Sequence, residues 1–174
     1  MTKSPPDDPL VILRHWQEAV PHDRLAHLVR DASRALARAL SERLAAHDVS
    51  FGHWTFLRAL WEQDGVTQKD LSRQVGVMEP TTFAAVKAME AKGYVVRRQR
   101  AANRKNVYVH LTRQGRALER KLVPLAETVN HIGVAGIDPR DVATTRTVLL
   151  ALLANLARDA ATSPAAPAPP PVPR

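Results

Sequence analysis

The feature of this sequence that most clearly points to a binding partner is a concentration of cations between residues 92 and 121. This window holds ten Lys and Arg residues against one acid, so its net charge is +9, slightly more than the +8 of the whole 174-residue chain. Guanidinium and ammonium groups gathered in this way attract polyanions, most simply nucleic acid and less often an anionic membrane. Because the rest of the chain is close to neutral, we expect the contact with a polyanion to be local.

The centre of this window, YVVRRQRAANRKNVYVHLT (94–112), has the pattern of a β-hairpin. Two Val-rich runs flank a polar tip, and apolar and polar side chains alternate over 107–111 as in a half-buried strand. The candidate DNA contacts here are Arg98, Arg100, Arg104 and Lys105. The alternative is that these cations merely solvate the edge of a hairpin.

The residue pattern gives no support to catalytic, metal or cofactor chemistry. The chain has no cysteine, which excludes disulfides, thiolate metal ligands and a cysteine nucleophile. Its seven histidines form no HxxxH or HExxH pair, and no G-x-S-x-G, G-x-G-x-x-G or Walker sequence occurs. We therefore expect no metal site, no cofactor and no enzymatic activity.

The ends of the chain predict neither export nor membrane insertion. The N-terminus, MTKSPPDDPL, is polar and acidic, unlike a signal peptide, and no run of about 18 apolar residues could span a membrane. We expect a cytoplasmic protein without a membrane partner. Residues 1–8 and the Pro/Ala-rich tail 161–174 are expected to be disordered, because neither can form a core.

Apolar periodicity predicts helices on both sides of the hairpin, and so a mainly α fold with a small β-hairpin wing. Ser50, Thr67 and Asp138 are good helix caps, and Asp70 completes a box-like start with Thr67. The helices are expected at 9–20, 23–47, 51–63, 68–75 and 79–92, and after the hairpin from 113 and from 139, with a break at 130–137.

Two of these short helices, joined at Gly76, indicate a helix-turn-helix whose second helix lies in the DNA major groove. A basic hairpin directly after that helix would be the wing of a winged helix, reaching phosphates or the minor groove. The candidate DNA contacts on the two helices are Gln68, Pro80, Thr81, Thr82, Ala84 and Lys87. The alternative is that they are ordinary surface residues, with Thr82 facing inward and Gln68 solvated.

The stretch 65–118 resembles the winged helix of MarR-type transcriptional regulators, most specifically in TQKDLSRQVGV, MEAKGYVVRR and LTRQGRAL. The resemblance extends over about residues 23–160. It implies an obligate homodimer whose two winged helices bind a pseudo-palindromic operator in double-stranded DNA. The implied organisation is an N-terminal extension at 1–22, a helical dimerisation region at 23–49 and 113–160, and a winged helix-turn-helix at 50–112.

This sequence departs from the family pattern at two positions. Where the family usually has an acid that braces the wing tip, this chain has Asn103, so we expect a less rigid tip. Where the recognition helix often carries an arginine, this chain has Ala84. Specificity is therefore expected to depend more on DNA shape than on bidentate arginine contacts.

The same resemblance implies a pocket for a small aromatic, commonly carboxylate-bearing, effector between the dimer helices and the winged helix. Arginine binds carboxylates bidentately, and aromatic side chains stack on rings. The candidates are Trp16, His27, Arg30, Arg34, His53 and Trp54, of which His27, Arg30 and Arg34 share one helix face. The alternative is that Trp54 belongs to the core and that the arginines are solvated.

The sequence thus predicts a homodimeric, sequence-specific DNA-binding transcriptional regulator, most simply a repressor that a small aromatic ligand releases from its operator. The rival interpretation is a nucleoid-type DNA-binding protein without effector control. The missing cysteine excludes thiol-based redox sensing, which favours a small-ligand effector within the family interpretation.

Overall fold

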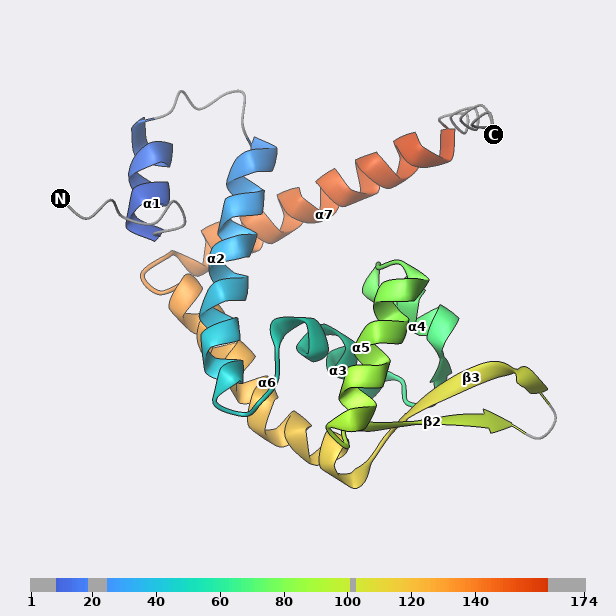
Figure 1. Ribbon diagram of the computed structural model, residues 1–174. Coiled ribbons are helices and arrows are strands. Elements are labelled where there is room, and N and C mark those ends of the chain that lie inside the picture. Colours follow the sequence, from blue (N-terminus) through green and yellow to red (C-terminus); the bar gives the residue numbers. More distant parts are fainter. Residues whose placement is uncertain (1–8, 19–24, 101–102, 163–174) are drawn as a thin grey trace, which may run out of the picture. The chain divides into compact units, whose positions relative to one another are not determined.

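The computed structural model describes residues 9–18, 25–100 and 103–162. These residues form a mainly helical structure with one small antiparallel sheet (Figure 1), and the chain divides after Gly133 into two parts, 1–133 and 134–174. The helices are α1 (Pro9–Glu18), α2 (Leu25–Ala45), α3 (Phe51–Glu62), α4 (Gln68–Val75), α5 (Glu79–Ala91), α6 (Arg113–Gly133) and α7 (Pro139–Thr162). The strands are β1 (Val66–Thr67), β2 (Val95–Arg100) and β3 (Asn103–Leu111).

Helices begin where the sequence places caps. The hydroxyl oxygens of Ser50 and Thr67 each accept a hydrogen bond, at 3.1 Å, from the backbone N–H three residues later. Asp138 Oδ1 accepts one at 2.8 Å from the N–H two residues later. Each bond satisfies an amide that the first helical turn leaves unpaired. The predicted helices and hairpin are all found. Residues 161 and 162, expected in the disordered tail, instead end α7, while the expected disorder of 1–8 and 163–174 lies outside the described residues.

The C-terminal end of α6 differs from the prediction. A break was expected from residue 130, but the helix continues to Gly133. Val129 is buried in this last stretch, and Gly133 lies close against Leu36 of α2. Packing against α2 therefore extends the helix beyond the point where its local sequence favours an end.

The small sheet has one strand that the sequence did not predict. β1 pairs antiparallel with β3, with Val66 opposite Val109, and the strand order is β1-β3-β2. Two residues are too few to show an alternating pattern. β2 and β3 form the predicted hairpin, which starts with Val95 opposite Leu111 and extends away from the helices (Figure 1).

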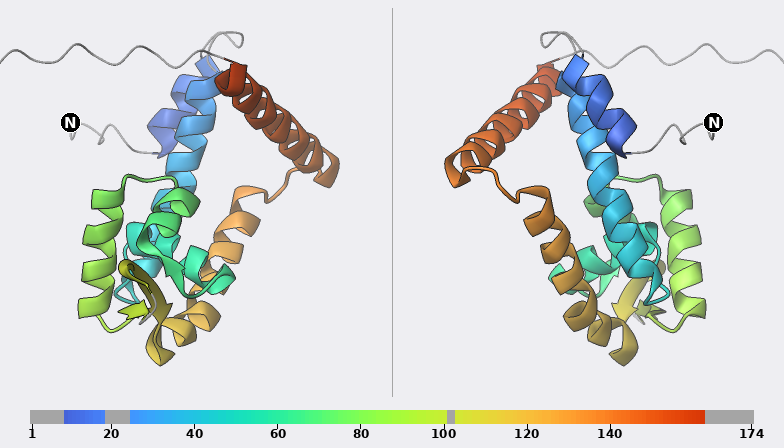
Figure 2. Two further views of the ribbon diagram at one scale, coloured as in Figure 1. Left: turned by 90° about the vertical axis from the view of Figure 1, so that its right-hand side faces the viewer. Right: turned by 90° about the vertical axis from the view of Figure 1, so that its left-hand side faces the viewer.

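One hydrophobic core joins the helix-turn-helix and the wing to the helices that flank them. It contains Leu40 and Leu44 of α2, Trp54, Phe56, Leu57 and Leu60 of α3, Leu71 of α4, Val86 and Met89 of α5, Val95, Val109 and Leu111 of the sheet, and Leu118, Leu122 and Val129 of α6. The views in Figure 2 show α3, α4 and α5 grouped beside the C-terminal half of α2. The elements predicted to bind DNA are thus held as one packed unit.

The outer helices have apolar side chains that this core does not cover. On α2 the exposed ones are Leu25, Leu28, Val29 and Leu36. No residue of α7, which the structure describes from end to end, is buried, and its exposed apolar residues include Val148, Leu150, Leu153 and Leu156. Apolar surfaces of this extent mark places where proteins associate.

Candidate nucleic-acid interface

The junction between α4 and α5 is fixed by two kinds of contact. Gly76 ends α4 with a left-handed φ of 75°, a conformation that glycine adopts without strain, and its N–H donates to the Ser72 carbonyl at 2.9 Å. Across the junction, Ser72 Oγ donates to Thr82 Oγ1 at 2.7 Å, and both residues are buried. This satisfied polar pair sets how α5 is placed on α4.

α5 has one face in the core and one in solvent. The predicted DNA contacts on its solvent face are Pro80, Thr81, Ala84 and Lys87, all of which are exposed. Thr82 is 0% exposed, and its hydroxyl group is held by Ser72. The prediction of Thr82 as a DNA contact is therefore wrong, and its side chain instead helps to position the helix.

Gln68, at the start of α4, also departs from the predicted role. The residue is half-buried, and its amide nitrogen Nε2 is buried without a hydrogen-bond partner among the described residues. This nitrogen therefore does not lie on the surface where a phosphate would be met.

Neighbouring cations of the wing have different environments, because successive side chains of a strand point to opposite faces. Arg98 is exposed, as expected for a phosphate contact, whereas Arg97 is half-buried. The side chains of Arg100, Asn103, Arg104 and Lys105 lie outside those that the structure describes. The contacts predicted for the wing tip therefore stay predictions.

Arg97 links the wing to α5 through a contact that we call the Glu90–Arg97 clamp. Arg97 Nε donates to Glu90 Oε2 at 2.8 Å, and the Arg97 backbone N–H donates to Glu90 Oε1 at 2.9 Å. These hydrogen bonds hold the pKa of Glu90 below its ordinary value. The same guanidinium lies over the ring of Phe83, 5.6 Å from its centroid. This clamp was not predicted from the sequence, because it joins residues on either side of the Gly93 turn.

Asp64 fixes the base of the wing. Its Oδ1 accepts hydrogen bonds from the N–H groups of Leu111 at 2.8 Å and Gly65 at 2.9 Å, and its Oδ2 accepts one from Arg116 Nη1 at 2.6 Å. Burial alone would raise the pKa of Asp64, but the hydrogen bonds from Leu111, Arg116 and Gly65 outweigh it and lower the pKa. One carboxylate therefore ties the start of β1, the end of β3 and α6 together.

The residues predicted to bind an aromatic effector fall into two groups. Trp16 Nε1 donates to Asp31 Oδ2 at 3.2 Å, and Arg30 Nε donates to Asp31 Oδ1 at 3.0 Å. The guanidinium of Arg30 is thus already paired with a carboxylate of the protein, and nearby Arg34 and exposed His27 lie on the same helix. A carboxylate at residue 31, one position after Arg30, was the signal that the sequence analysis overlooked.

His53 and Trp54 form the second group, on α3. About 20 Å of helix axis separates Arg30 from Leu44, whose side chain shares a core with Trp54. Burial, with the charge of Lys92, lowers the pKa of His53. Its Nδ1 is buried and has no hydrogen-bond partner among the described residues. Trp54 itself is 6% exposed and belongs to the hydrophobic core, which is the alternative that the sequence left open for it.

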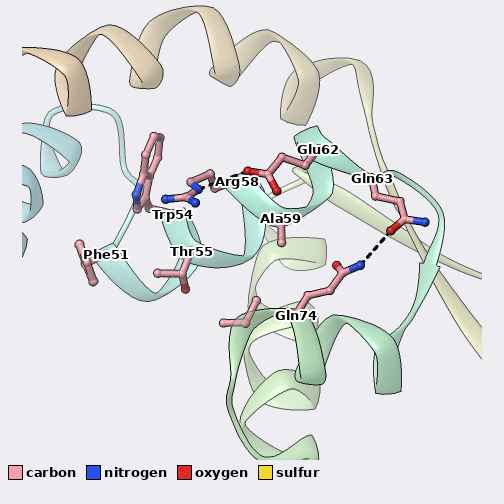
Figure 3. A pocket seen from close by; sticks show the side chains of 9 residues that line it. Phe51, Trp54, Thr55, Arg58, Ala59, Glu62, Gln63 and Gln74 are labelled. Carbon is pink, nitrogen blue, oxygen red and sulfur yellow. Dashed lines mark hydrogen bonds and ion pairs between the residues drawn. The ribbon is translucent and has the colours of Figure 1, made fainter. Parts of the chain in front are cut away.

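A cavity of about 650 Å³ lies between α3 and α4 and has Trp54 in its wall. Figure 3 shows Arg58 beside Trp54 and pointing toward Glu62, which it meets at 3.7 Å. Gln63 and Gln74 join the two helices by a hydrogen bond of 2.9 Å. The spacing of Trp54, Arg58 and Glu62 at successive fourth positions of one helix was the available sequence signal. The remaining lining residues are Phe51, Thr55, Ala59 and Val75.

Comparison with known proteins identifies the family to which this chain belongs. The MarR family profile matches residues 49–107, and the solved transcriptional regulator PA3341 is 31% identical, over 78% of this chain and 99% of that one, with a TM-score of 0.69. This chain belongs to the MarR family. Its α4 and α5 are thus the helix-turn-helix, and its β2–β3 hairpin is the wing, of a MarR-type transcriptional regulator.

Two other similar proteins add context. The regulator TtmR of Methylorubrum extorquens is 30% identical over 117 residues, which are 67% of this chain, and this chain spans 60% of its length. A structure of Bordetella bronchiseptica BpsR, which concerns regulation of its DNA binding by 6-hydroxynicotinic acid, covers 78% of this chain and 99% of its own at 22% identity and a TM-score of 0.66. The BpsR match shows a shared fold.

The described residues lack two other kinds of feature. No three His, Asp or Glu side chains there gather closely enough to hold a metal ion. No helix there combines the length and the apolar character needed to cross a bilayer.

Proposed function

We propose that this protein is a homodimeric cytoplasmic repressor of transcription that binds a pseudo-palindromic operator and leaves it when a small aromatic acid binds. The observation that carries the proposal is the exposed face of α5 directly beside a basic wing in a MarR-family chain. Cations of the wing, such as Arg98, would contact phosphates and set the register. The face of α5 around Thr81, Ala84 and Lys87 would then meet base edges.

The homodimer is supported by the uncovered apolar side chains of α2 and α7. A second copy of the chain would bury both sets, since a two-fold interface uses the same surface of each partner. A two-fold dimer would also present two α5 helices about one turn of DNA apart. That spacing is what a pseudo-palindromic operator requires.

The cavity between α3 and α4 is the proposed effector site. Trp54 lies in the wall of this cavity but is only 6% exposed, so it would give a ligand a small apolar contact, while Arg58 offers a guanidinium to its carboxylate. The pair of Arg58 with Glu62 is long, at 3.7 Å, and exposed on both sides, so it is weak and a ligand can replace Glu62. A ligand there would move α4 relative to α3, and α5 with it. The ligand would favour the protein that is free of DNA if it binds this shifted arrangement of the helices more tightly than the operator-bound one.

The effector proposal is tested by thermal shift with 6-hydroxynicotinic acid, other aromatic acids and their coenzyme A thioesters. A compound that raises the melting temperature should also release DNA in a fluorescence anisotropy titration. Arg58→Ala should lose both responses, while Arg30→Ala, at the Asp31 cluster, should keep them. The reverse pattern would place the site at α1 and α2. If no compound acts on the wild type, the effector part fails and operator binding still stands.

Operator binding is tested by footprinting across promoter regions. A discrete footprint with two related half-sites supports the repressor, while uniform coating of the DNA supports a nucleoid-type protein. Binding to the protected site should weaken steeply as salt is raised, because phosphate contacts release counterions. An affinity that hardly changes between low and moderate salt would contradict the role of the wing.

A further inference from the structure

The solvent face of α5 carries a large aromatic side chain that the predicted DNA contacts did not include. Phe83 is 52% exposed, and it lies on the same side of the helix as Pro80 and Lys87, three residues before it and four after. α5 contains no Arg, Asn or Gln. Of the side chains that most often hydrogen-bond purine edges, α5 therefore offers only Lys87.

The ring of Phe83 is held in place from one side. Arg97 places its guanidinium over the ring, and the Glu90–Arg97 clamp fixes that guanidinium through a hydrogen bond from Nε to Glu90 Oε2, while the Arg97 backbone N–H donates to Glu90 Oε1. Because Arg97 is paired in this way, its charge is largely committed to Glu90. The clamp thus orients the ring of Phe83 and leaves about half of the Phe83 surface exposed.

In the major groove, the apolar group that a base pair presents is the C5-methyl group of thymine. A hydrophobic side chain on the face of a recognition helix meets that group without leaving a polar atom unpaired. We propose that Phe83 reads thymine methyl groups in the operator and that Arg97 is a positioning residue that sets the angle of the ring. This inference rests on the proposed operator binding and names what its helix recognises.

The test uses a duplex that the wild-type dimer selects from a library of random sequences. Each thymine of the selected half-site is replaced in turn by deoxyuridine, which removes the methyl group and keeps every hydrogen-bonding atom. At a contacted thymine, binding should weaken about fourfold. This figure follows from about 0.8 kcal/mol for burial of one such group and about 1.4 kcal/mol for each tenfold change in affinity.

Variants assign the effect to the ring. In Phe83→Ala, the affinity ratio between thymine and deoxyuridine duplexes should fall to about one, and Phe83→Leu should keep part of it. Arg97→Lys should lower the ratio without changing the melting temperature, since lysine keeps the charge but not the planar group over the ring. Arg98→Ala is the matched control: it removes a wing cation, so it should weaken both duplexes equally and leave the ratio unchanged.

The outcomes separate this inference from the function on which it rests. A wild-type protein that selects no sequence would overturn the operator proposal itself. A wild-type protein that selects a sequence but binds deoxyuridine duplexes equally well would overturn the role of Phe83 alone. So would a ratio that survives in Phe83→Ala, measured on a variant whose melting temperature matches the wild type.

Discussion

The winged helix and the outer helices of this protein differ in how much of their apolar surface one chain can cover. In the winged helix, the core residues of α3, α4, α5 and the sheet are buried among themselves, against the C-terminal part of α2 and against α6 from Leu118 to Val129. In α7 and the first half of α2, leucines of the same type remain exposed. One chain thus buries the core beneath the predicted DNA-reading surface by itself, whereas the outer helices expose apolar side chains that the proposed dimer would cover.

The largest effect is expected from a substitution that disturbs the packed core of the winged helix at Gly115. A Cβ atom at this position would collide with the carbonyl oxygen of Tyr94, and Trp61 Nε1 donates a hydrogen bond to the Gly115 carbonyl at 3.0 Å. Because a backbone atom cannot move aside as a side chain does, Gly115→Ala should lower the free energy of unfolding by about 3 kcal/mol or more. Chemical denaturation measures this loss. Gly52→Ala is the comparison variant, because Gly52 is exposed and the nearest atom to the added Cβ is Ser50 Oγ at 3.9 Å, an ordinary contact.

The next largest effect is expected from charges placed on the exposed apolar surface of α7. Leu153→Glu combined with Leu156→Glu places two acids on exposed apolar positions of α7. These acids would have to be buried in the dimer, so sedimentation should detect monomers, and operator affinity should fall about 100-fold or more because half of the contacts are lost. Phe83→Glu, the same kind of change on α5, should leave the dimer intact. A double variant that stays dimeric would show that α7 is not the interface.

Features that depend on neighbours in the chain could be predicted from the sequence, and features that depend on distant contacts could not. Ser50, Thr67 and Gly76 act on their own neighbours in the chain, so the helix starts and the turn of the helix-turn-helix were correctly predicted. β1 was missed because two residues carry no pattern. Thr82 was misplaced as a DNA contact because its burial depends on Ser72, ten positions earlier.

The candidate site was harder to predict than the fold because its parts meet only in three dimensions. The Glu90–Arg97 clamp needs the turn at Gly93 to bring α5 and β2 together. The cavity beside Trp54 needs α3 packed on α4. A sequence states which side chains are available, but not which of them are already paired, as Arg30 is with Asp31.

A smaller effect should appear at Asp64, because the packing of the winged helix against α6 depends on the charge of this carboxylate. The pKa of Asp64 is lowered in the folded protein, so its stabilisation is present above the unfolded pKa of about 3.9 and is lost as the pH falls through the lower folded value. Asp64→Asn should cost about 1–2 kcal/mol at neutral pH and less in acid. Melting temperatures measured from pH 3 to pH 7 would show the gap between the two proteins closing. Glu119→Gln, an exposed acid of α6, should show no such gap.

The smallest effect tests how the exposed part of the wing contributes to binding. Arg98 is exposed, in contrast to its half-buried neighbour Arg97. If Arg98 contacts one phosphate, Arg98→Ala should weaken operator binding several-fold at moderate salt and reduce the slope of log affinity against log salt by about one. Arg98→Lys should keep the slope, because it keeps the charge. A slope that is unchanged in Arg98→Ala would mean that the phosphate contacts come from other cations of the wing, and that the exposure of Arg98 is not a sign of binding.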